Sequence, residues 1–255
     1  MSKSPLYSLR VGCVQYLNSK PLIHGYTGSI TLEHPSSLAR DLANGQLDAA
    51  LVPTFEVLDH PHYALVDNVA IASDGPVYSV LLAYRGPIRM IKSVKLDPAS
   101  RTSQNLVRVI LAEFHDTHPD FGAEGEAELI IGNQAIEFRE LHEKDTDLQI
   151  LDLGEEWKRC TRLPFVYALW ALRPDLENLC EIAGAFRALK ENGIANLEAV
   201  IAEDNTGTPE FRRRYLTEHI RFGLQDEEKR GIARYRQLLV KYGLIETTVS
   251  ALIFI

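Results

Sequence analysis

Polar turns with hydroxyl and amide side chains follow the apolar runs of this sequence at five places. These turns read YLNSK, PSS, GPVYS, PASRTS and GNQ, at residues 16–20, 35–37, 75–79, 98–103 and 132–134. In PASRTS, Ser100, Thr102 and Ser103 occur where a helix is predicted to begin. Hydroxyls, free backbone N–H groups and the positive end of the helix would meet there, which suits a carboxylate. We therefore predict that the turns line one ligand cleft.

Each turn also has a purely structural interpretation. One hydroxyl before the predicted helix would be an ordinary cap, and Asn18 would suit a tight turn. Ser79 could be a satisfied hydroxyl within a strand, and Asn133 could cap a helix. Three hydroxyls and Arg101 in PASRTS are more than a cap requires. This turn therefore favours ligand binding most strongly.

Other kinds of site lack support in the sequence. The pairs His60 with His62 and His115 with His118 have no Cys, Asp or Glu at a recognisable spacing, so no metal is predicted. Nucleophile-elbow, zinc-protease, phosphate-loop and dinucleotide motifs are absent. With 35 acidic against 27 basic residues and a formal charge of −8, the chain is not expected to bind nucleic acid.

The two ends of the chain carry further expectations. The N-terminus lacks the apolar segment of a secretory signal, and no apolar run has the ~18 to 20 residues that span a membrane. We therefore expect a cytoplasmic protein. The last six residues, SALIFI, are apolar and could form a tail strand or a homodimer contact.

The elements that must hold these turns alternate between strand and helix. Short apolar runs rich in β-branched residues predict strands, and apolar residues three or four apart predict helices. The alternation predicts an α/β fold with largely parallel sheets. Residues 116–127 are polar and are predicted as a loop. The predicted strands are LRVGCVQ, ITLEH, LDAALVP, LVDNVAIAS, VYSVLLAY, SVKLD, AELIIG and FVYALWAL.

The order of these elements indicates two lobes with a ligand cleft between them, where strand ends and helix starts converge. We place residues 1–88 and 173–255 in the first lobe and residues 89–172 in the second. The chain is helical from about residue 175 onward, and this part is expected to pack on the first lobe. Its predicted helices cover residues 179–193, 210–224 and 227–243.

Taken in order, the turns resemble the chorismate dehydratase family of the futalosine route to menaquinone. The resemblance covers nearly the whole length and implies a two-lobed fold like that of type II periplasmic binding proteins. It also implies loss of water from chorismate, a dicarboxylate, to give 3-[(1-carboxyvinyl)oxy]benzoate, with no cofactor and no metal. The matching stretches are VGCVQYLNSKPLIHG, HPSSLARDLANGQLDAALVPTFE, IASDGPVYSVLLAY, LDPASRTSQNLVRVIL, LIIGNQAI, LDLGEEWKRCTRLPFVYALWALR and RFGLQDEEKRGIARYRQLL.

The resemblance also assigns roles to residues. Asn18 matches the position next to the reacting ring, and so it is the catalytic candidate. The family commonly has Asp after the IIG strand where this chain has Asn133, which makes Asn133 a candidate for binding more than for catalysis. The candidates for substrate binding are Ser36, Ser79, Ser100, Thr102, Ser103 and Asn133.

Two other functions fit the same architecture. The 1,4-dihydroxy-6-naphthoate synthase of the same pathway has a similar architecture, but its first motif is expected to be richer in Ser, Pro, Asn and Asp than YLNSKPL. A non-catalytic protein that binds a small carboxylate would have the same cleft and would leave its ligand unchanged.

Overall fold

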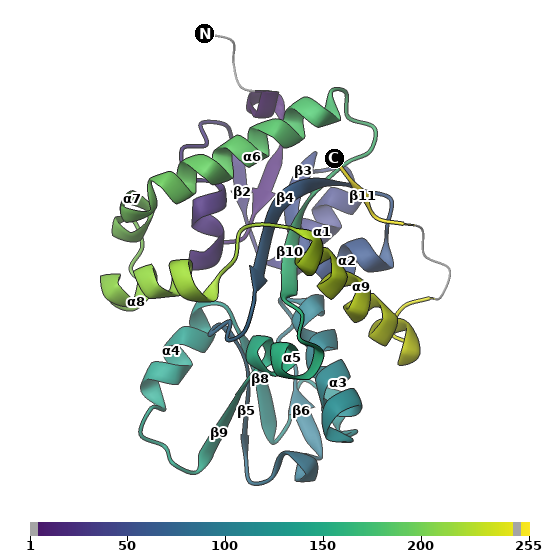
Figure 1. The fold of residues 1–255 in the computed structure, drawn as a ribbon, viewed down its shortest axis with the longest axis vertical. Helices are drawn as coiled ribbons and strands as arrows, with labels where there is room; N and C mark the ends of the chain where they lie inside the picture. The colour runs from purple at the N-terminus through teal and green to yellow at the C-terminus, as the bar shows by residue number, and fades with distance from the viewer. Residues whose placement is uncertain (1–4, 247–250) are drawn as a thin grey trace.

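Two β-sheets with helices around them make up the protein. The computed structural model describes residues 5–246 and 251–255 (Figure 1). The first sheet has the order β11-β4-β10-β3-β1-β2, with β11 Ile253–Phe254, β4 Ala64–Ser73, β10 Phe165–Leu172, β3 Ala49–Pro53, β1 Val11–Cys13 and β2 Ile30–Leu32. The second has the order β7-β6-β8-β5-β9, with β7 Asp120–Gly122, β6 Ser93–Lys95, β8 Ala127–Ile131, β5 Val80–Arg85 and β9 Leu148–Asp152. We call each sheet with its helices a lobe.

Helices pack around both sheets, and the C-terminal helices α6 and α9 contact strands of the first sheet (Figure 1). The first lobe contains η1 Pro5–Ser8, η2 Leu17–Leu22, α1 Pro35–Ala43, α2 Thr54–Asp59, α6 Leu179–Ala195, α7 Leu197–Ala202, α8 Pro209–Arg214, η4 Tyr215–His219 and α9 Asp226–Lys241. The second contains η3 Ile88–Met90, α3 Arg101–His115, α4 Asn133–Leu141 and α5 Leu153–Thr161.

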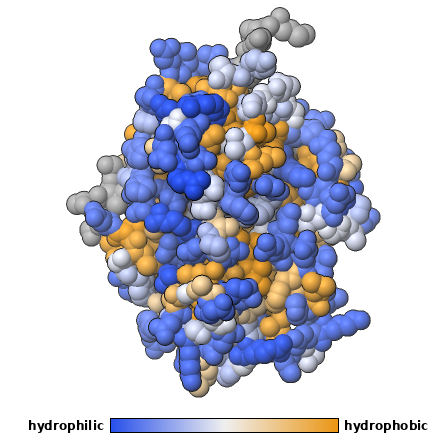
Figure 2. Space-filling model, turned by 180° about the vertical axis from the view of Figure 1, so that it is seen from behind, coloured by the Kyte–Doolittle hydropathy of each residue, from blue (hydrophilic) through white to orange (hydrophobic). Residues whose placement is uncertain are grey.

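The central strands are apolar because both of their faces are covered. All five residues of β3 are buried, and α1 packs on it through Leu38 and Leu42. Polar residues dominate the face seen in Figure 2, with hydrophobic side chains between them. Among the described residues, no helix has the length and apolar character needed to cross a membrane.

The sheets are mixed, whereas the sequence predicted largely parallel ones. β1 runs parallel to β2 and β3, and β6 runs parallel to β7 and β8. β10 runs antiparallel to β3 and β4, and β5 runs antiparallel to β8 and β9. β5 and β10 are the strands next to the two crossings between the lobes, which accounts for their reversed direction.

The crossings themselves lie at residues 74–79 and 162–164. The sequence-based division at residues 88 and 173 puts β5 in the first lobe and β10 in the second. In the structure β5 belongs to the second sheet and β10 to the first. Both strands are apolar along most of their length, and an apolar run does not reveal which sheet it joins.

Three further segments refine the sequence-based picture. The predicted loop 116–127 contains β7, a short edge strand. The predicted helix 210–224 ends at His219, after which Arg221 bridges to Ala72 of β4. The apolar C-terminus forms β11 parallel to β4, although Ser250 of the predicted tail lies outside the described residues.

Candidate active site

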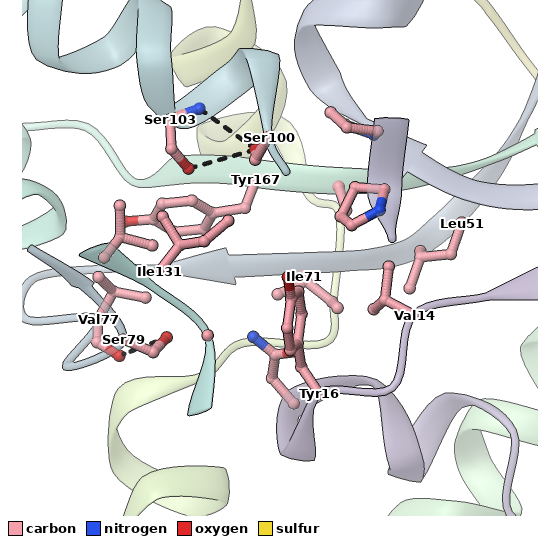
Figure 3. A pocket seen from close by; sticks show the side chains of 16 residues that line it. Val14, Tyr16, Leu51, Ile71, Val77, Ser79, Ser100, Ser103, Ile131 and Tyr167 are labelled. Atoms are coloured by element: carbon pink, nitrogen blue, oxygen red, sulfur yellow. Dashed lines mark hydrogen bonds between the residues drawn. The ribbon is translucent and has the colours of Figure 1, made fainter. Parts of the chain in front are cut away.

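A cavity lies between the two sheets, and residues from both lobes line it (Figure 3). Apolar side chains such as Leu51, Ile71 and Val77 form much of its wall. None of its lining residues in the described structure is charged. Its polar lining side chains are Tyr16, Asn18, Ser79, Ser100, Ser103 and Tyr167.

Asn18 reaches the cavity because β1 ends in the short helix η2, on which it is the second residue. Its Nδ2 donates to the hydroxyl of Tyr215 at 3.2 Å. Its Oδ1 is buried and has no hydrogen-bond partner among the described residues. A buried amide oxygen without a partner is rare in folded proteins and is a reason to consider contact with a ligand at this residue.

Tyr215 joins Asn18 to a second predicted residue. It lies on η4, a π-helical turn, and such turns are frequent at functional sites. Its hydroxyl donates to Ser79 Oγ at 2.7 Å, so the amide and two hydroxyls form one chain of hydrogen bonds. Burial raises the pKa of Tyr215 well above its usual value, although the bonds to Ser79 and Asn18 act in the opposite direction. The phenol is therefore neutral at physiological pH.

The start of α3 supplies hydroxyls to another part of the cavity. Ser100 caps the helix, since its Oγ accepts from the N–H and from the Oγ of Ser103, both at 3.3 Å. Both serines also line the cavity. Ser100 is therefore both a helix cap and a residue of the cavity lining.

Three other predicted residues do not line the cavity. Thr102 is fully buried, and its Oγ1 accepts from Phe55 N–H of α2 at 2.8 Å. Ser36 lines a neighbouring groove beyond Tyr16. Asn133 Oδ1 accepts from a backbone N–H of η2, that of Leu17, at 3.2 Å. None of these three side chains belongs to the lining of the cavity.

The polar turns contain two cationic side chains, Lys20 and Arg101, and both form ion pairs with carboxylates outside the cavity lining. Lys20 pairs with Asp204 at 2.5 Å. Arg101 pairs with Glu56 and Asp59, both at 3.0 Å. A bound anion in the cavity would consequently meet neutral hydrogen-bond donors and not a lining cation.

Asp152 was not among the sequence candidates, although it organises the crossing that carries Val77 and Ser79. It is buried, and its position as the cap of α5 was the only available signal. Because the partners of its carboxylate come from α4, α5 and the 74–79 crossing, it fixes one wall of the cavity. Those donors are the N–H groups of Val77, Tyr78, Gly154 and Glu155 and the guanidinium of Arg139.

The aromatic residues of the site were also missed. Tyr167 comes from β10, with its hydroxyl 3.2 Å from Ser73 Oγ. Burial, with the nearby charge of Asp97, raises the pKa of Tyr16 to about 12. Nothing local distinguishes such tyrosines from core tyrosines, so only the fold reveals them.

Comparisons with known proteins agree with this architecture. A protein-family model described as menaquinone biosynthesis matches residues 9–241. A chorismate dehydratase of Thermus thermophilus is 26% identical, in an alignment covering 90% of this chain and 94% of that protein. A solved structure from Archaeoglobus fulgidus matches with a TM-score of 0.73 and 17% identity, covering 93% of this chain and 98% of that one.

Two further solved structures show the fold alone. A Candida albicans protein with the generic periplasmic binding protein fold has a TM-score of 0.63 and 13% identity, over 94% of this chain and 92% of its own. The periplasmic aliphatic sulphonate binding protein of Escherichia coli has a TM-score of 0.60 and 14% identity, over 94% and 89%. The predicted two-lobed binding-protein fold is confirmed. Since the family model spans most of the sequence, the chain belongs to the menaquinone biosynthesis family.

Proposed function

We propose that the protein is a chorismate dehydratase, a carbon–oxygen lyase that converts chorismate to 3-[(1-carboxyvinyl)oxy]benzoate in the futalosine route to menaquinone. One observation carries the proposal. Among the described residues, no charged side chain lines the cavity, while Asn18, whose Oδ1 has no partner there, and the hydroxyl-rich start of α3 both line it. The similarity to the chorismate dehydratase of Thermus thermophilus supports it. A cytoplasmic location and a homodimer stay predictions from the sequence.

The start of α3 suits a carboxylate of the substrate. Ser100 Oγ accepts two bonds from Ser103, so its own O–H is left to donate to a ligand. The positive helix end favours the anion without a lining cation. Lobe closure around the bound dianion would exclude water and strengthen these bonds.

Asn18 is proposed to act at the ring hydroxyl that leaves. Its free Oδ1 can accept from that hydroxyl and so align the carbon–oxygen bond for cleavage. In the reaction this bond breaks, a ring carbon–hydrogen bond breaks, and the released hydroxide and proton make one water. The ring becomes aromatic, which drives the elimination.

The proton acceptor is proposed to be a carboxylate of the substrate itself. No carboxylate or histidine lines the cavity in the described part of the chain. Tyr215, which is hydrogen-bonded to Asn18, is neutral because burial raises its pKa. The protein's part is then to orient the substrate and to exclude water.

The direct test is to mix purified, metal-free protein with chorismate and to follow the ultraviolet spectrum and the mass. We expect the loss of one water and the spectrum of an aromatic enol ether. Folded protein that leaves chorismate unchanged would reject the proposal. Calorimetric binding of chorismate without turnover would point instead to a binding protein. The sulphonate-binding protein of similar fold is an example of that class.

A further inference from the structure

The helix that carries Asn18 begins without a cap from its own residues. Tyr16 precedes η2 in an extended conformation, and its side chain makes no capping hydrogen bond. The first N–H groups of a helix lack partners within it. The N–H of Leu17 is satisfied from the other lobe, where Asn133 Oδ1 accepts it at 3.2 Å across 116 residues of sequence.

Asn133 is neither the cap of α4 nor one of the residues that line the cavity. It is the first residue of α4, and the cap position before it is Gly132, which makes no side-chain capping bond. It does not line the cavity, although Gly132 does. The contact with Leu17 is the interaction that the structure assigns to its side-chain oxygen.

A second contact between the lobes lies beside this bond. Gly132 has φ +67°, and a Cβ placed there would lie 2.6 Å from Cε1 of Tyr16. The ring of Tyr16 therefore rests against the bare backbone of the β8–α4 turn. Tyr16 lines the cavity on one side and the neighbouring groove on the other, so this contact forms part of the wall between them. We use the name clasp for these two contacts between the lobes, Leu17 with Asn133 and Tyr16 with Gly132.

We infer that Asn133 is a positioning residue for Asn18. By capping η2 from the second lobe, it holds the turn that presents the Asn18 amide to the cavity. The clasp forms only when the lobes meet, and so the reacting end of the cavity is completed by closure. This inference rests on the proposed function for its catalytic consequence.

The test compares Asn133→Ala, Asn133→Asp and the exposed control Glu137→Ala on the same helix. Asn133→Ala removes the acceptor, and we expect kcat for chorismate to fall about tenfold with a smaller change in KM, as for one lost positioning bond. Asn133→Asp keeps an acceptor oxygen and is expected to stay within about threefold of the starting protein. Glu137→Ala is expected to leave both constants unchanged.

A double-mutant cycle separates positioning from a general structural role. If Asn133 acts through Asn18, Asn133→Ala should have little further effect on kcat in an Asn18→Ala background. An undiminished effect in that background would overturn the inference, as would full kcat in Asn133→Ala or failure of Asn133→Asp to rescue.

Amide hydrogen exchange tests the clasp without turnover. We expect the Leu17 amide to exchange about tenfold faster in Asn133→Ala and the amides of α9 to be unchanged. Unaltered exchange at Leu17 would reject the clasp. Starting protein that does not convert chorismate would reject the proposed function, and exchange would then still decide whether the clasp exists.

Discussion

Asn18, Tyr215 and Ser79 come from three distant segments and form one hydrogen-bond chain beside the cavity. The Oδ1 of Asn18 stays without a partner among the described residues. A buried polar atom left in this way costs about 1–3 kcal/mol of folding free energy. A donor on a bound ligand would offset that cost, and so the unpartnered oxygen points to a binding function.

Replacing Asn18 with Ala should lower kcat by about 100-fold or more and weaken chorismate binding by less than about tenfold. The reason is that the amide is proposed to act on the breaking bond more than on the bound ground state. Steady-state kinetics and calorimetric binding would measure the two effects. The exposed neighbour Gln15→Ala is the control, and an unchanged kcat in Asn18→Ala would remove Asn18 from the mechanism.

Replacing Tyr215 with Phe removes one hydroxyl and keeps the ring that stacks on Phe211. We expect kcat to fall about tenfold because the Asn18 amide loses its acceptor and Ser79 loses its donor. Tyr242→Phe removes a hydroxyl bonded to Glu113 far from the cavity and should leave kcat unchanged. Equal kinetics for both variants would show that the chain of hydrogen bonds does not matter.

At the scale of elements, the start of α3 contacts both the cavity and α2. Ser100 and Ser103 line the cavity, whereas Thr102 and Arg101 contact α2. Residues three apart lie on the same side of a helix, which lets Ser100 and Ser103 share the cavity side while Thr102 points toward α2. One turn thereby lines the cavity and joins the lobes.

Replacing Thr102 with Val should therefore affect stability more than binding. The Phe55 N–H would lose its acceptor in a buried place, and we expect the free energy of unfolding to fall by about 1–3 kcal/mol. Thr102→Ser keeps the acceptor and should stay close to the original stability. Ser103→Ala should show the reverse pattern, with a higher KM and a small change in stability; denaturant titration and kinetics would distinguish the two.

At the scale of the whole molecule, carboxylates with lowered pKa values hold elements together. Burial raises the pKa of Glu156, but bonds and charges from Arg159 and His115 outweigh it and lower the pKa overall. This residue ties α5 to α3, with Oε1 2.7 Å from Nε2 of His115. Glu113 likewise has a lowered pKa, chiefly through hydrogen bonds from Lys241 and Tyr242 of the α9 region.

These shifts predict a loss of stability in acid. A carboxylate with a pKa lower in the folded than in the unfolded protein stabilises the fold above the unfolded pKa, and this contribution is lost as pH falls through the folded pKa. We expect Tm to be steady near neutrality and to fall below about pH 5. Glu156→Gln should lower Tm at pH 7 and flatten its pH dependence; an unchanged slope would contradict the role given to Glu156.

The sequence by itself determined the succession of strands and helices, because the periods that define them repeat over a few neighbouring residues. It also located the polar turns from which Asn18, Ser79, Ser100 and Ser103 reach the cavity. The order of the elements indicated two lobes, and the family resemblance implied the binding-protein fold.

Only the tertiary structure decided which sheet took β5 and β10, which turn residues face the cavity, and that Tyr215 joins Asn18 to Ser79. It also decided that Asn133 caps η2 across the lobes. Each of these depends on a strand pairing or a side-chain contact with a partner far away in the chain. Local periodicity is unaffected by such partners, and so it cannot reveal them.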